Sequence, residues 1–332
     1  MKCQINIRSY NDLDHLAPVV YGLLVRGHST VVRIQSSAIS VSDPRLKWVN
    51  DNFPSCSVSK SGIGSLIHDR MKRSKSITFL LARTLLDLIF CPRLRPGMDA
   101  YVFEWSEPTF AERLHMLWRR LRVVALPHGL NIYLNSDFNE ALASVESENK
   151  AGPQRTPDFQ RRSAFTYYVV QTEKMRLLIE SWGLSSDKLR VLSSLRFTET
   201  WINNLDQIWK DEEIDPAFKD WSASHKGYAL FLLPHWSYNV KYGQVIDLLS
   251  SLSDRSIPIV IRAHTRGTGS LPADQLEKLA SSSTFYSESI PTSHLIRLAS
   301  CVISFGSSVA LEALTRGIPL INPRHLHGNS TI

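Results

Sequence analysis

The sequence lacks paired cysteines. Its four cysteines, Cys3, Cys56, Cys91 and Cys301, are scattered over 332 residues and form no CxxC pair. This spacing argues against a zinc site and against a small scaffold held together by disulfides. Cys3 and Cys301 lie inside apolar runs, where an unpaired cysteine acts as a small core residue.

Long apolar segments are missing too. The N-terminal MKCQINIRSY has no stretch long enough for a signal peptide, and the most apolar run, 79–90, is short and interrupted by Arg83 and Asp87. Neither segment fits a membrane span. We therefore expect a protein of a reducing compartment, the cytoplasm.

Three common catalytic signatures are also absent. The chain contains no P-loop, no GxSxG and no GxGxxG, so kinases, esterases and dehydrogenases lack their motifs here. Asp12-Leu13-Asp14 has the form of a DxD metal motif, but acidic residues are favoured in the first turn of any helix. We expect no bound metal and no cofactor.

The chain does carry an excess of positive charge. Lys and Arg number 38 against 31 for Asp and Glu, a net charge of +7, which favours a phosphate-bearing ligand or an anionic surface. We expect no nucleic-acid partner. Two clusters combine basic and apolar residues: Lys72, Arg73 and Lys75 precede an apolar helix, and Trp118 adjoins the arginines of 119–122. They predict peripheral attachment to the inner face of the plasma membrane, or else two partly buried helices with solvated ends.

Strand and helix patterns alternate along most of the chain. KCQINIRSY reads as a strand, the next segment as a helix capped by Asn11 and ending near Gly27, and STVVRIQ as a second strand. One helix with basic ends is expected within 67–97. The polar segment 203–227 has no strand pattern, and we place a linker there. The pattern predicts an α/β protein with a Rossmann-like domain at 1–202 and another at 228–332.

Polar residues follow several predicted strands. Pro127-His128-Gly129 ends one strand, Arg262-Ala263-His264 a second, and Gly306-Ser307-Ser308 a third. Open α/β sheets bind ligands outside the carboxyl ends of their strands, so these residues are candidates for a site. At His128, the neighbouring glycine allows close backbone approach to a substrate, although the pair also suits a plain turn.

The serine-containing turn has two interpretations. One serine hydroxyl caps the following helix, or the hydroxyls and backbone N–H groups meet a phosphate. Glu312 lies four residues after Ser308 on the same helix face, where it either accepts hydrogen bonds from ribose hydroxyls or faces solvent. His264, with Arg262 and Arg266, forms a cationic cluster suited to a diphosphate, or lies in a loop.

Taken together, these segments resemble the GT-B glycosyltransferases. HLAPVVYGLLVRGHSTVV (15–32) is similar to the first βα unit of that superfamily, and SFGSSVALEALTRGIPLI is similar to its donor-binding segment. IVIRAH and VVALPHG resemble bacterial surface-polysaccharide transferases of the Kdo, sialic-acid and teichoic-acid types. The resemblance covers both halves in separate pieces. It implies two Rossmann-like domains facing each other across a cleft.

The resemblance also implies roles for individual residues. His15 matches the catalytic base of some inverting members, and Asp14 beside it is a competing candidate. His128 is a third candidate because its predicted strand also ends at the cleft. Glu312 would meet the donor ribose. The donor phosphate would meet His264, Ser307 and Ser308, and the residue pattern adds Arg262 and Gly306 as candidates.

The sequence departs from the GT-B pattern in two places. Thr265 stands where a proline usually follows the histidine of the second-domain strand. The sequence also stops at NPRHLHGNSTI, whereas GT-B enzymes usually continue with a helix that crosses back to the first domain. Either the enzyme is compact, or the C-terminal end is incomplete.

We therefore predict a metal-independent, inverting glycosyltransferase. It would move a sugar from a nucleotide-sugar donor to a lipid-linked acceptor or a surface polysaccharide such as capsule or lipopolysaccharide. Three alternatives stay open: a CDP-glycerol-type glycerophosphotransferase, a non-hydrolysing nucleotide-sugar 2-epimerase, which needs no acceptor, and an inactive partner in an assembly complex. The sequence identifies neither the nucleotide, the sugar nor the acceptor.

Overall fold

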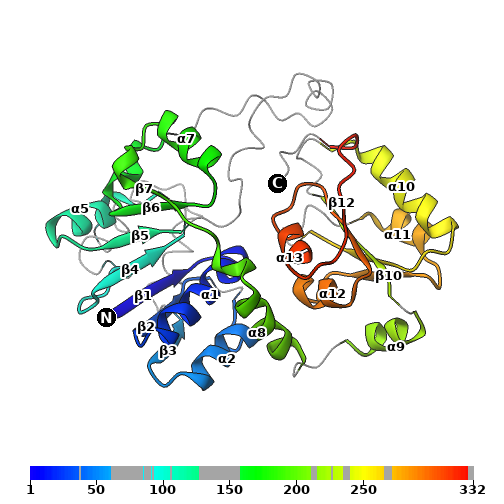
Figure 1. Cartoon of the computed structure of the whole chain (residues 1–332), viewed down its shortest axis with the longest axis horizontal. Helices are drawn as coiled ribbons and strands as arrows, with labels where there is room; N and C mark the ends of the chain where they lie inside the picture. The colour runs from blue at the N-terminus through cyan, green and yellow to red at the C-terminus, as the bar shows by residue number, and fades with distance from the viewer. Residues whose placement is uncertain are drawn as a thin grey trace. The chain divides into compact units, whose positions relative to one another are not determined.

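The computed structural model contains two compact units, each built on one parallel sheet (Figure 1). Among the described residues the first unit ends at Arg196 and the second begins at Phe197. The structure describes residues 1–36, 39–60, 85, 91, 93–104, 107–126, 158–210, 215–225, 227–234, 240–264 and 271–327.

The first unit has a sheet in the order β3-β2-β1-β4-β5-β6-β7, with every neighbouring pair parallel. Its strands are β1 (Lys2–Ile7), β2 (Ser29–Ile34), β3 (Cys56–Lys60), β4 (Ala100–Phe103), β5 (Val123–Ala125), β6 (Tyr167–Val170) and β7 (Leu189–Val191). Its helices are α1 (Tyr10–Val25), α2 (Pro44–Asn52), α5 (Phe110–Trp118) and α7 (Glu173–Ser181), with short 3-10 turns η3 (Gln160–Ala164), η4 (Ser186–Lys188) and η5 (Leu195–Phe197).

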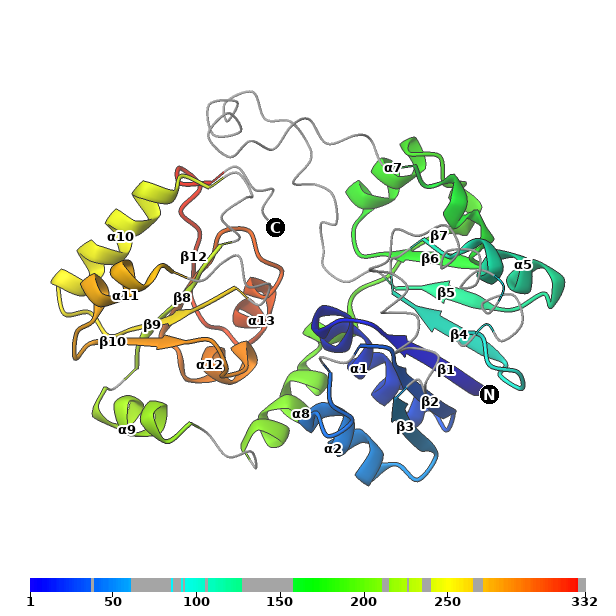
Figure 2. The same ribbon diagram turned by 180° about the vertical axis from the view of Figure 1, so that it is seen from behind.

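The second unit has the order β10-β9-β8-β11-β12, again all parallel. Its strands are β8 (Ala229–Leu232), β9 (Ile259–Arg262), β10 (Thr284–Ser287), β11 (Cys301–Ile303) and β12 (Leu320–Ile321). Its helices are α8 (Glu199–Lys210), α9 (Pro216–Ser224), α10 (Tyr242–Asp254), α11 (Ala273–Leu279), α12 (Thr292–Leu298) and α13 (Ala310–Thr315) (Figure 2).

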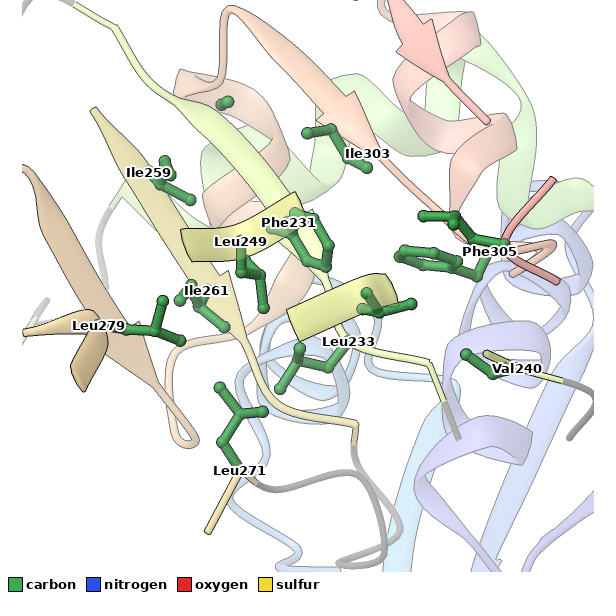
Figure 3. Close-up of a cluster of buried hydrophobic side chains, with 13 residues drawn as sticks. Phe231, Leu233, Val240, Leu249, Ile259, Ile261, Leu271, Leu279, Ile303 and Phe305 are labelled. Carbon is green, nitrogen blue, oxygen red and sulfur yellow. The ribbon is translucent and has the colours of Figure 1, made fainter. Parts of the chain in front are cut away.

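Helices cover both faces of the second sheet, because successive strand side chains point to opposite sides. On one side, Phe231, Ile261 and Ile303 pack with Leu249 of α10 and Leu279 of α11 (Figure 3). The residues one position earlier in the same strands pack on the other side with α9, α12 and α13: Leu230, Val260 and Val302 with Phe218, Leu295 and Ala313. Both faces of the sheet are therefore buried, and the helices leave the ends of the strands uncovered.

The expected alternation of strands and helices is confirmed, with local differences. Ser9, not Asn11, caps α1: its side chain accepts a hydrogen bond from the N–H of Asp12. Strands β3 and β10 were not expected from the sequence, and both lie at a sheet edge. The segment 203–227 holds most of α8 and all of α9, and both helices belong to the second unit.

No helix among the described residues has the length and hydropathy of a membrane span. The helix expected within 67–97 falls mostly outside the described residues, as does the cluster of Lys72, Arg73 and Lys75.

Candidate functional site

The strand order of each sheet marks one position for a ligand. In the first sheet the order reverses between β1 and β4, and in the second between β8 and β11. Neighbouring loops leave in opposite directions there, and open α/β sheets usually bind their ligands at this point, outside the carboxyl ends of the two strands. Two expected groups lie at these positions: Asp14 and His15 follow β1, and Gly306, Ser307 and Ser308 follow β11.

The serine turn (Gly306, Ser307 and Ser308) is held in place by the residue before it. Phe305 is 5% exposed and packs in the core, 5.5 Å from the ring of Phe231 (Figure 3). Gly306 then takes φ of 83°, a left-handed conformation that favours glycine. A buried aromatic anchor followed by a glycine thus directs the serines out of the sheet.

The serine turn does not cap α13 in the usual way. The N-cap position is Val309, which makes no side-chain cap, and Ser307 Oγ accepts only a long 3.4 Å bond from the N–H of Val309. The N–H groups of the serine turn have no hydrogen-bond partner among the described residues. Three backbone donors and two hydroxyls are therefore available to an anion, while α13, with six residues, contributes little by its dipole.

Ser304 adds a further polar group next to the turn. It follows the last residue of β11, is 1% exposed, and its Oγ has no hydrogen-bond partner among the described residues. A buried hydroxyl without a partner normally costs stability and calls for an explanation. Its place beside the serine turn is consistent with a role in binding.

Glu312 lies in the first turn of α13 but does not face solvent. It is fully buried, and its Oε2 accepts a 3.0 Å hydrogen bond from Ser293. Its Oε1 lies 3.3 Å from Nη2 of Arg316, whose Nη1 bonds both carboxylate oxygens of Asp206 at 2.7 and 2.9 Å. Ion pairs therefore link α8 to α13 and a hydrogen bond links α12 to α13, and any contact of Glu312 with a ribose would have to be made within this network.

Arg262 lies at the end of β9 and bonds to the protein itself. Its Nη1 donates to the carbonyl oxygens of Ala263, Ser287 and Glu288 at 3.2, 3.3 and 2.7 Å, tying β9 to the end of β10. Burial lowers the pKa of Arg262. Strand β8 lies between β9, which ends at Arg262 just before the half-buried His264, and β11, which leads to the serine turn. The backbones of β9 and β11 are therefore two strand spacings, or about 10 Å, apart. Arg262 therefore ties the end of β9 to the end of β10, and its expected contact with a phosphate stays a prediction.

In the first unit, Asp14 and His15 share one arginine. Asp14 Oδ2 lies 3.4 Å from Arg196, and its Oδ1 pairs with Arg45. His15 is 6% exposed, with Nε2 3.2 Å from Arg196 Nη1 and Nδ1 3.5 Å from Ser194 Oγ. A guanidinium only donates hydrogen bonds, so Nε2 must accept this one. The Asp14 side chain keeps 29% of its surface exposed and is the more accessible of the two candidate bases.

The first sheet also contains a carboxylate that sequence reasoning missed. Glu104 directly follows β4, is 2% exposed, and lies 2.5 Å from Arg8 Nη1 and 3.0 Å from Arg93 Nη2. Arg93 also reaches Glu112 at 3.1 Å. Burial alone would lower the pKa of Arg93, but the two carboxylates more than offset this and raise it. Arg8 follows β1, so its ion pair with Glu104 joins the strand ends at which the order reverses.

Some expected residues fall outside the described part of the chain. His128 lies within 127–157, and Thr265 and Arg266 lie within 265–270, so the structure does not place them. Within the described ranges no three His, Cys, Asp or Glu side chains gather as a metal site. Asp12 and Asp14 serve other partners: Asp12 accepts from the N–H of Arg8, and Asp14 pairs with arginines.

Comparison with solved structures shows the fold. A UDP-GlcNAc 2-epimerase from Neisseria meningitidis, bound to UDP-GlcNAc, matches 98% of this chain and 84% of its own, with TM-score 0.60 and 17% identity. A UDP-GlcNAc 2-epimerase from Methanocaldococcus jannaschii matches 98% and 85%, with TM-score 0.59 and 12% identity. TcCGT1 in complex with UDP matches 97% and 80%, with TM-score 0.58 and 11% identity.

No protein-family model matches the sequence, and no curated protein matches it. The structural matches extend over both units, so the resemblance to the GT-B superfamily is confirmed for the fold. The chain has the GT-B fold, which glycosyltransferases share with UDP-GlcNAc 2-epimerases. Identities this low define the fold alone, and a shared fold does not specify the reaction.

Proposed function

We propose that this protein is an enzyme acting on a nucleotide-activated sugar, with the donor phosphates held by the serine turn of the second unit. The observation that carries the proposal is the position of this turn. It follows β11 where the strand order reverses, and its backbone donors have no partner among the described residues. Phosphate groups bind at such clusters of N–H groups and hydroxyls. Solved structures of this fold that hold UDP or UDP-GlcNAc point to the same class of ligand.

Of the possible reactions, we place the non-hydrolysing 2-epimerase first. Both epimerases reported above match this chain over nearly its full length. Inverting a ring carbon requires groups that remove a proton and return it on the other face. The first unit has such groups near its strand ends, where Asp14, His15 and Glu104 lie after β1 and β4.

The glycosyltransferase is the second candidate, favoured by the motif resemblance and by the match to TcCGT1. This reaction needs one base, for the acceptor hydroxyl, and Asp14 and His15 are its candidates. The acceptor would be a lipid-linked glycan or a growing surface polysaccharide. A glycerophosphotransferase would instead require a CDP-linked donor.

The nucleotide is tested first, by melting-temperature shifts with CMP, CDP, UDP and GDP. A ligand at about 100 times its Kd stabilises the folded state by about 2.7 kcal/mol, which gives a measurable shift. A response to UDP fits either leading candidate, and a response to CDP alone favours the glycerophosphotransferase. If no nucleotide or nucleotide sugar raises the melting temperature, the proposed function is wrong.

The reaction is then tested by incubating the protein with nucleotide sugars in deuterated water without an acceptor. An epimerase produces a second sugar nucleotide and exchanges a ring proton for deuterium, which proton NMR detects. A glycosyltransferase leaves the ring protons in place and consumes the donor only when an acceptor is added. If no ring proton exchanges and the donor is consumed only when an acceptor is present, the glycosyltransferase becomes the first candidate.

A further inference from the structure

Helix α5 carries an apolar stripe on its outer side. Four large side chains of this nine-residue helix are exposed: Phe110 (57%), Leu114 (41%), Leu117 (69%) and Trp118 (83%). Their spacing of i, i+4, i+7 and i+8 places them on one side of the helix. We call these four residues the α5 stripe.

The opposite side of α5 already packs on the first unit. Ala111, Glu112 and Met116 are buried, and Glu112 completes a capping box with Thr109. Figure 2 shows the helix beside β5. The stripe is therefore not a displaced core face, because the helix buries a separate set of residues against its own sheet.

The stripe forms a sizeable apolar patch. Aromatic side chains bury 150–250 Å² each, so at these exposed fractions the four side chains present on the order of 500 Å². The largest apolar patch on a typical monomer has about this size and is often functional. Singly exposed apolar residues need no explanation, but a contiguous stripe on one helix face does.

Three arginines lie on or just after the helix that carries the stripe. The guanidinium of Arg113 lies 5.9 Å from the ring centre of Phe110, and Arg120 and Arg122 are exposed just beyond Trp118. None of these three arginines pairs with a carboxylate among the described residues. The surface therefore combines an apolar strip with unpaired guanidinium groups, and its complement is apolar in the middle and anionic at the rim.

We propose that the α5 stripe and its arginines dock this protein on an anionic lipid bilayer. Leu and Phe side chains enter the acyl boundary, Trp prefers the headgroup level, and arginines meet lipid phosphates. A second protein is a poorer fit, because a stable interface involves about 20–30 residues a side. The proposal rests on α5 and its arginines alone, so it is independent of the sugar chemistry.

The test is cosedimentation with vesicles of phosphatidylcholine alone or with about one third phosphatidylglycerol, at about 50 and 500 mM NaCl. We expect binding to the anionic vesicles at low salt, and about tenfold weaker binding at high salt or without phosphatidylglycerol. Leu117→Ser combined with Trp118→Ser should weaken it by about tenfold or more. Arg120→Asn with Arg122→Gln should remove the dependence on anionic lipid; Asn suits the left-handed φ of 48° at residue 120.

Leu177→Ser is the matched control. Leu177 is 55% exposed on α7, so it has similar exposure on a different helix, and its replacement should leave vesicle binding unchanged. All variants should have melting temperatures close to that of the parent protein, since exposed positions contribute little to stability. Equal recovery of the parent protein with neutral and anionic vesicles overturns the proposal. The proposal also fails if the parent protein forms a dimer, does not bind vesicles, and dissociates when Leu117 and Trp118 are replaced. The stripe is then an interface between copies of this chain.

Discussion

Replacement of the two serines of the serine turn separates a phosphate site from a structural turn. Ser307→Ala removes a hydroxyl whose one hydrogen bond among the described residues is the 3.4 Å bond from the N–H of Val309, and the Ser308 hydroxyl makes none among them. A full N-cap contributes about 1 kcal/mol, so Ser307→Ala should cost less than this and Ser308→Ala almost nothing in stability. If each hydroxyl donates to a phosphate, its loss should cost about 1.5–3 kcal/mol of binding, a tenfold to hundredfold loss of nucleotide affinity.

The assay measures nucleotide affinity by calorimetry and the melting temperature for each variant. Ser304→Ala is a useful companion, because its buried hydroxyl has no partner among the described residues. Its removal should leave stability unchanged or raise it, while affinity falls if the ligand uses this group. Ser251→Ala, at an exposed position on α10, serves as the control. If Ser307→Ala and Ser308→Ala melt lower yet bind nucleotide as tightly as the parent protein, the turn is only structural.

Three further predictions follow from the two units. Either Asp14→Ala or His15→Ala should abolish turnover in steady-state assays while nucleotide affinity stays nearly unchanged. If both variants keep near-normal turnover, the catalytic base is another residue. Arg316→Met should lower the free energy of unfolding in urea by about 3–5 kcal/mol, because it strands a fully buried carboxylate; a loss below about 1 kcal/mol contradicts this. Burial lowers the pKa values of His294 and His327 from 6.5 to about 4. As the pH falls, these histidines take up protons in the unfolded chain before they do so in the folded protein. The free energy of unfolding in urea should therefore stay constant above about pH 6.5 and fall toward pH 4, less steeply in His327→Gln. Equal slopes for the parent and the variant would refute this prediction.

The interior strands were predictable from sequence, whereas two edge strands were not. Val260 and Leu230 belong to short apolar runs, because parallel strands inside a sheet are covered on both faces. Strand β3, CSVSK, and strand β10, TFYS, lie at sheet edges, and neither contains a run of three apolar residues. Edge strands are often polar, which removes the pattern that identifies a strand.

The candidate site was predictable only in part. The rule that polar residues after a strand mark the ligand edge selected the serine turn, and the same rule applied to Glu104 after YVF would have found the missed carboxylate. It could not distinguish a ligand-binding arginine from a supporting one. Arg262 bonds to carbonyls of a neighbouring strand that sequence did not reveal, so its role depends on the missed β10.

The order in which the strands are made differs from their order in space. Strand β1 pairs with β2 on one side and with β4, almost 100 residues later, on the other; β8 likewise pairs with β9 and the later β11. During synthesis on the ribosome, each central strand therefore leaves the exit tunnel with both edges unpaired. The first unit cannot close until residue 103 has emerged, and apolar strands with open edges are exposed to aggregation in that interval. Chaperone binding before that point would protect the nascent chain most.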